Sequence, residues 1–248
     1  MDFARYDGDL KEIKTLFSIT SEIIINKFST NPEDTACDWN EAQERYEITL
    51  GVIIQEFKYY LIHEVGHILL AKRLQYPYFA RTPTELKTTA TPDQEVIFEF
   101  SNHIIDAFVD YVAFHEFEVN YPFFIEFMDA LLKKGISSRA DIIYLLKAYI
   151  YFSLQLRFVL KAYDRVLRRD KIQLFLSRLQ HLIKLKSDRY SALLTKLDSK
   201  IDLFDTLKSS RDATEILNFM LNVLSELPLK NLDNTFKQWF PDGTQGDC

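Results

Sequence analysis

Two histidines and a glutamate stand within an apolar stretch, Tyr59–Leu74, which reads YYLIHEVGHILLAKRL. His63 and His67 are four residues apart, and Glu64 directly follows the first histidine. On a helix, residues four apart lie one turn apart on the same face, so both imidazoles could bind one metal ion. Glu64 would lie about 100° around the helix from His63, beside that ion. This is the HExxH arrangement of zinc hydrolases.

A catalytic zinc is usually bound by three protein groups, with the fourth position left to water, so a third ligand is required. Candidates lie on the next long apolar segment, where Asn102, Asp106 and Asp110 recur every four residues among Ile, Phe, Val and Tyr. Burial of a carboxylate is costly unless it is paired or bound to metal, so two aspartates on an apolar helix indicate such a role. The residues leave open whether Asp106, Asp110 or His103 is the third ligand.

These features resemble the zincin metallopeptidases. The motif His63–His67 with a downstream acidic helix is most similar to the gluzincin arrangement, where an acidic ligand is followed four residues later by an aspartate. The resemblance implies that Asp106 binds the metal and that Asp110 accepts a hydrogen bond from a ligand histidine. An aspartate ligand also occurs in other zincins, but their Gly-Thr-x-Asp signature is absent. Leu70 and Arg73 stand where metzincins have a glycine and a third histidine.

The resemblance covers roughly residues 50–115 and implies a zinc-dependent peptidase. Zinc bound by His63, His67 and Asp106 would lower the pKa of a water, and Glu64 would take its proton as the water attacks an amide carbonyl. Glu64 would then pass this proton to the leaving amine. The residues themselves indicate only a metal-assisted hydrolytic site, because the peptide substrate is implied by the resemblance alone.

A different hypothesis is a helical binding or regulatory protein whose zincin-like site holds metal structurally or has lost turnover. Its working surface would be residues 151–200, which hold 12 basic and 4 acidic side chains, whereas residues 1–150 hold 14 and 24. The basic residues alternate with leucines at helical spacing, which favours a solvated helix face over a contact with nucleic acid or an acidic partner.

The composition predicts a globular, mainly α-helical protein. The 248 residues are 47% hydrophobic, with only 6 glycines and 7 prolines, too few for the turns of an all-β fold. We expect at most a short β element, at Arg45–Ile53, where polar and apolar residues alternate. The HExxH helix should end near Leu74, and after a loop over residues 75–91 a capping box of Thr91 and Gln94 should begin the next helix.

The remaining helix start and the domain boundaries have weaker signals in the sequence than the HExxH helix has. Ser29–Asn31 and Pro32 predict a further helix that begins near Pro32. We expect a zincin-like core over residues 1–135, a helical region over 136–240 that packs on it or continues the same domain, and a flexible tail over 241–248.

No segment indicates secretion or a membrane span. The N-terminus lacks a basic region followed by an apolar core, and the most apolar later window is interrupted by Lys147 and Arg157. Cys37 and Cys248 allow at most one disulfide, and neither has a partner at metal-ligand spacing. We therefore expect a cytoplasmic protein with a peptide or protein substrate, no membrane partner and no bound nucleic acid.

Overall fold

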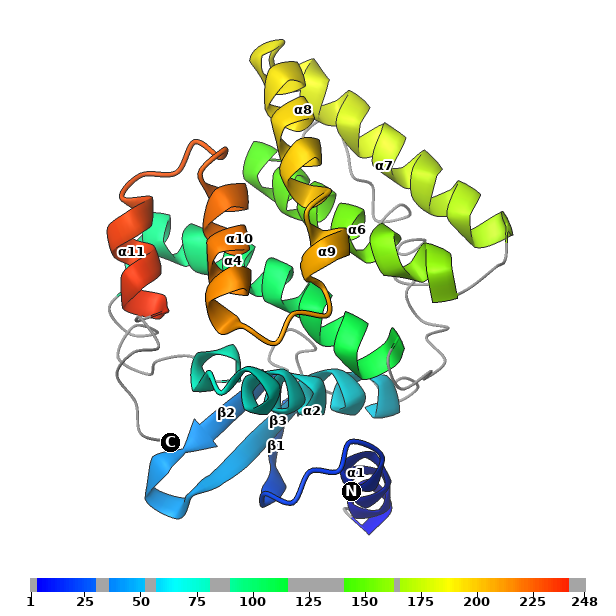
Figure 1. Cartoon of the computed structure of the whole chain (residues 1–248), viewed down its shortest axis with the longest axis vertical. Coiled ribbons are helices and arrows are strands. Elements are labelled where there is room, and N and C mark those ends of the chain that lie inside the picture. Colours follow the sequence, from blue (N-terminus) through cyan, green and yellow to red (C-terminus); the bar gives the residue numbers. More distant parts are fainter. Residues whose placement is uncertain are drawn as a thin grey trace. The chain divides into compact units, whose positions relative to one another are not determined.

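The computed structural model of the chain is mainly helical, as the composition predicts, with one small sheet among its described residues. These residues are 4–29, 36–51, 57–80, 90–115, 141–162 and 166–240. Within these ranges, no helix combines the length and the apolar character needed to cross a membrane. The chain divides into two compact units, whose elements are labelled in Figure 1.

The first unit contains a three-stranded sheet with β3 (Arg45–Gly51) at its centre. β3 pairs in parallel with β1 (Ile23–Ser29) and antiparallel with β2 (Ala36–Asn40). Ile48 in the middle of β3 is fully buried, because one face of the sheet is covered. The strand expected at Arg45–Ile53 is therefore confirmed over Arg45–Gly51, but β1 and β2 were not predicted.

The prediction of a helix that begins near Pro32 is wrong for residues 36–43, which the structure describes. Ala36–Asn40 forms strand β2, and a single 3-10 turn, η2 (Glu41–Gln43), follows it. β2 pairs with β3 along its whole length. This pairing satisfies the backbone groups on the facing edges of the two strands, so the long-range contact outweighs a local helix-start signal. Pro32 itself lies outside the described residues.

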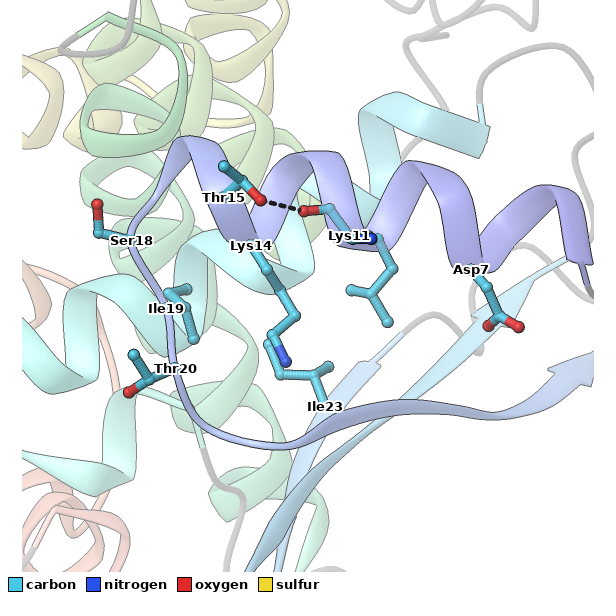
Figure 2. Close-up of a pocket in the computed structure, with 9 residues that line it drawn as sticks. Asp7, Lys11, Lys14, Thr15, Ser18, Ile19, Thr20 and Ile23 are labelled. Atoms are coloured by element: carbon cyan, nitrogen blue, oxygen red, sulfur yellow. Dashed lines mark hydrogen bonds between the residues drawn. The ribbon is translucent and has the colours of Figure 1, made fainter.

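Helix α1 (Ala4–Leu16) and the chain that leads from it into β1 border an open pocket of about 510 Å³. Figure 2 shows the Lys14 side chain extending toward Ile23, while the Thr15 hydroxyl donates a 2.8 Å hydrogen bond to the carbonyl oxygen of Lys11. None of the predicted metal ligands is among the described residues that line this pocket. The pocket is therefore separate from the predicted site.

The second unit is helical throughout its described part. Its elements are α4 (Pro92–Asp110) as far as Phe108, α6 (Ile142–Ala162), α7 (Val166–Lys186), α8 (Arg189–Ile201), α9 (Phe204–Leu207), α10 (Ala213–Leu224) and α11 (Leu232–Trp239). Helix α6 packs against α7 and α8. The ring of Phe108 makes edge-to-face contacts with Phe204 and Phe219, with centroids 4.8 and 5.8 Å apart. These aromatic contacts join α4, α9 and α10 in one core.

A partly buried polar network also connects three helices of the second unit. The Tyr149 hydroxyl on α6 donates a hydrogen bond to the Asp198 carboxylate on α8 and accepts a 2.8 Å bond from Gln180 Nε2 on α7. Burial, together with the hydrogen bond to Asp198, raises the pKa of Tyr149. Because each group has a partner, the network fixes the contacts of α6, α7 and α8.

The division between the units falls inside α4. Residues Ala90–Phe108 group with the C-terminal helices, whereas residues 109–115, which include the π-helix η4 (Tyr111–His115), group with the first unit. The domain boundary expected at residue 135 and the tail expected at 241–248 lie outside the described residues, so these remain predictions.

The capping box that was expected to begin α4 is confirmed. The Thr91 backbone N–H donates to Gln94 Oε1 at 2.8 Å, and the Gln94 N–H donates to Thr91 Oγ1 at 3.4 Å. Thr91→Ala should lower the free energy of unfolding by about 1 kcal/mol, because the Gln94 amide group loses the Thr91 hydroxyl as its acceptor. Urea denaturation monitored by circular dichroism measures this. Thr195→Ala, on an exposed position inside α8, is the control, and an equal loss in both variants would contradict a capping role.

Candidate metal centre

Helix α2 (Phe57–Leu74) carries the HExxH motif at its centre, as the sequence predicts. His63 and His67 are half-buried, and their rings lie edge to face with centroids 5.0 Å apart. Glu64 is only 5% exposed. The fully buried Leu61, Val65 and Ile68 anchor the apolar side of the helix. The two imidazoles are thus held next to each other by burial of the face behind them.

The orientation of His63 is set by a buried carboxylate at the end of α4. His63 Nδ1 lies 2.7 Å from Asp110 Oδ1, and Asp110 is fully buried. With the carboxylate as acceptor, His63 Nδ1–H donates this hydrogen bond and leaves the lone pair of Nε2 for a ligand. This contact is the one that the zincin resemblance implies for Asp110.

A backbone carbonyl sets the orientation of His67. His67 Nδ1–H donates a 2.8 Å hydrogen bond to the carbonyl oxygen of Phe79 in the 3-10 turn η3 (Pro77–Phe79). A carbonyl oxygen can only accept, so Nδ1 carries a proton, and in the neutral ring Nε2 is the nitrogen with the lone pair. The sequence did not predict this contact, because residues 75–91 carry proline and no pattern that marks one carbonyl. The hydrogen bond gives the turn a role in positioning His67.

Asp106 supplies the third group. It lies on the continuous helix α4, one turn before Asp110, and is half-buried. His63, His67 and Asp106 each offer one ligand atom, and these atoms all lie within 4.8 Å of one another. Two imidazoles and a carboxylate are a donor set of catalytic zinc, with bonds of about 2.0–2.2 Å. The residues therefore fit a zinc ion after small side-chain adjustments.

The two other candidate ligands are placed differently. Asp110 accepts a hydrogen bond from His63, so its position is that of a supporting group. His103 Nδ1 lies 3.8 Å from Asp106 Oδ2, and its ring faces Tyr151 with centroids 5.6 Å apart. The geometry thus favours Asp106 as the ligand, with His103 as its neighbour.

Gly66 allows α2 to lie close to the end of α4. A Cβ atom built on Gly66 would lie 2.9 Å from Val109 Cγ1 and 3.0 Å from Ala113 Cβ. Carbon atoms in a packed core lie about 3.5–4.0 Å apart, so any larger residue would displace the helix pair. The glycine within the HExxH motif therefore brings His63 within reach of Asp110. The sequence marks this glycine only through its place between two predicted ligands.

The sheet lies near Glu64, the predicted general base. Cys37 on β2 is a buried free thiol, and its pKa is raised mainly by burial and further by the negative charges of Glu64 and Asp38. Helix α2, which carries Glu64, packs against β2. β2 thus borders the site on the side of Glu64, a relation that sequence spacing could not indicate.

The chain was compared with protein-family models, with curated proteins and with solved structures, and no match was found in any of the three. The interpretation of the site therefore depends on the chemistry and geometry of its own residues.

The roles of the two histidines predict a clear pattern of metal content. His63→Ala or His67→Ala should each lose most of the bound zinc, whereas Glu64→Gln should retain it, because Glu64 is not a ligand. Elemental analysis of the dialysed proteins gives the zinc-to-protein ratio. His181→Ala, an exposed histidine on α7, is the matched control and should retain zinc. Stoichiometric zinc in His67→Ala would contradict the assignment.

The two aspartates should differ in their effect on zinc affinity. Asp110→Ala should weaken binding by about 10–100-fold, as expected for a group that orients a ligand. Asp106→Ala should weaken it further, because a ligand itself is lost. Competition with a chromophoric chelator measures both affinities, after circular dichroism has verified that each variant is folded. The opposite order would exchange the roles of Asp106 and Asp110.

Proposed function

We propose that the chain is a zinc-dependent hydrolase, with a peptide bond as the substrate most consistent with the zincin resemblance. The observation that carries the proposal is the cluster of His63, His67 and Asp106, whose ligand atoms lie within 4.8 Å of one another. A second observation supports it, since both histidines use Nδ1 for protein contacts and direct Nε2 elsewhere. Two independent elements thus prepare the same nitrogen of each ring for a ligand.

In this proposal, His63, His67 and Asp106 hold the metal. When bound, zinc supplies Lewis-acid chemistry, which acidifies a water and polarises a carbonyl group. Glu64 accepts the proton that the attacking water loses and then donates it to the leaving amine nitrogen. Because Glu64 is 5% exposed and lies on a packed helix, its carboxylate is held in place next to the ligands.

Asp110 has a positioning role. Its buried carboxylate accepts the hydrogen bond from His63 Nδ1, which holds the ring in one orientation and strengthens Nε2 as a ligand. The Phe79 carbonyl does the same for His67. These contacts would hold both rings in the orientation that presents Nε2 to a metal.

A structural metal site in a binding protein is the second candidate function. The observation that favours it is the exposure of Leu174 and Leu185 on the basic helix α7, which indicates a surface for a partner. The two functions differ in turnover, so a substitution of the predicted base separates them.

Glu64→Gln should reduce hydrolysis of a fluorogenic peptide library by about 10²–10⁴-fold, because the water then lacks its proton acceptor. Zinc content should stay unchanged, and Glu95→Gln, an exposed glutamate at the start of α4, should retain full activity. A chelator should abolish hydrolysis and added zinc should restore it. Stoichiometric zinc in a wild-type protein that cleaves no member of the library would favour the binding protein instead.

A further inference from the structure

The exposed side of helix α7 carries two large apolar side chains. Leu174 is 70% exposed and Leu185 is 62% exposed. They are eleven residues apart, which is three turns of a helix, so they lie on one stripe about 16 Å apart along its axis. An isolated surface leucine needs no explanation, but two on the same stripe present a repeated apolar contact.

Basic side chains lie on or beside the same stripe, between the leucines. Arg178 and His181 lie on this stripe, one and two turns after Leu174, whereas Lys184 flanks it about 100° around the helix from Leu185. All of these residues are exposed. We call this set, Leu174, Arg178, His181, Lys184 and Leu185, the outer face of α7. It combines apolar contacts at both ends with positive charge between them.

The opposite side of α7 is the one that the fold uses. Phe175, Leu179 and Ile183 are buried on it, and α7 packs against α6 and α8 in the second unit (Figure 1). Gln180 adds the hydrogen bond to Tyr149. Leu174 and Leu185 are therefore not part of the core that the described residues form.

We propose that the outer face of α7 binds an acidic amphipathic helix of a partner protein. Leu174 and Leu185 would contact apolar side chains three turns apart on the partner, as in other helix-on-helix recognition. Arg178 and Lys184 would pair with carboxylates that flank this apolar stripe. From Leu174 to Lys186 the helix holds three residues of fixed positive charge and no acidic residue, so this face attracts an acidic partner.

Charge disfavours a second copy of the chain as the occupant. An antiparallel pair of α7 helices could place Leu174 against Leu185 of the other copy. The same pairing would bring Arg178 and Lys184 of both copies into one interface, and such like charges repel.

The exposed leucines, Leu174 and Leu185, disfavour nucleic acid as the partner of this face. Phosphate groups would pair with Arg178 and Lys184 but would leave Leu174 and Leu185 in water, with no gain from their apolar surface. The outer face also contains no aromatic ring on which a base could stack. An acidic helix is the partner that uses both kinds of side chain on this face.

A designed peptide tests the proposal on the whole 248-residue chain. The probe is a labelled synthetic helix of about 20 residues, long enough to form a helix, with leucines on one stripe and glutamates on both sides. Fluorescence anisotropy should show micromolar binding that weakens as salt rises. A scrambled peptide of the same composition and a peptide with lysine in place of glutamate should not bind.

Variants separate the apolar and ionic parts of the contact. Leu174→Asn with Leu185→Asn should weaken binding by at least about tenfold. Arg178→Gln with Lys184→Gln should weaken binding and flatten its salt dependence. Leu203→Asn, at a surface leucine that lies outside α7 and is 46% exposed, is the control and should bind as the wild type does.

Three results would overturn the proposal. The first is the absence of binding by the designed peptide, or equal binding by the scrambled one. The second is dimerisation in sedimentation velocity that Leu174→Asn with Leu185→Asn abolishes, which would assign the face to a second copy. The third is tight binding of a labelled nucleic-acid duplex that is lost in Arg178→Gln with Lys184→Gln. Zinc content and hydrolysis do not enter these measurements, so the proposal is tested independently of the metal centre.

Discussion

The hydrogen bond between His63 and the buried carboxylate of Asp110 is the interaction on which the candidate site depends. A fully buried carboxylate is costly unless a donor satisfies it, and His63 Nδ1 lies 2.7 Å away. The bond joins the middle of α2 to the end of α4, where Gly66 leaves no room for a side chain. The hydrogen bond of Asp110 can therefore form only because α2 and α4 pack closely at Gly66. Together they place Asp106, one turn earlier on α4, beside the two histidines.

The two histidines are oriented by unlike partners. Asp110 is a charged side chain on a helix, whereas the acceptor for His67 is the Phe79 carbonyl in a short turn after α2. A backbone acceptor cannot be removed by a side-chain substitution, so His67 depends on the conformation of the turn. His63 depends instead on one residue. Both arrangements leave Nε2 available, which is the property that supports a metal at this place.

Local patterns predicted much of this arrangement. The four-residue spacing of His63 and His67 predicted one helix face, the Thr91–Gln94 pair predicted the start of α4, and the aspartates on an apolar helix predicted a polar contact. Strands β1 and β2 could not be predicted in the same way, because strands are stabilised by pairing between distant segments. The same limit explains the wrong helix near Pro32 and the unpredicted Phe79 contact. Both features depend on a contact with a distant segment, which the local sequence does not indicate.

The central claim is that His63, His67 and Asp106 bind one zinc ion. A crystal of the protein grown with zinc, measured above and below the zinc absorption edge, tests this claim without any assumption about activity. The account predicts a single strong anomalous peak within bonding distance of His63 Nε2, His67 Nε2 and an Asp106 oxygen. The absence of a peak there, or a peak bound by other residues while these three side chains contact only protein, would contradict it.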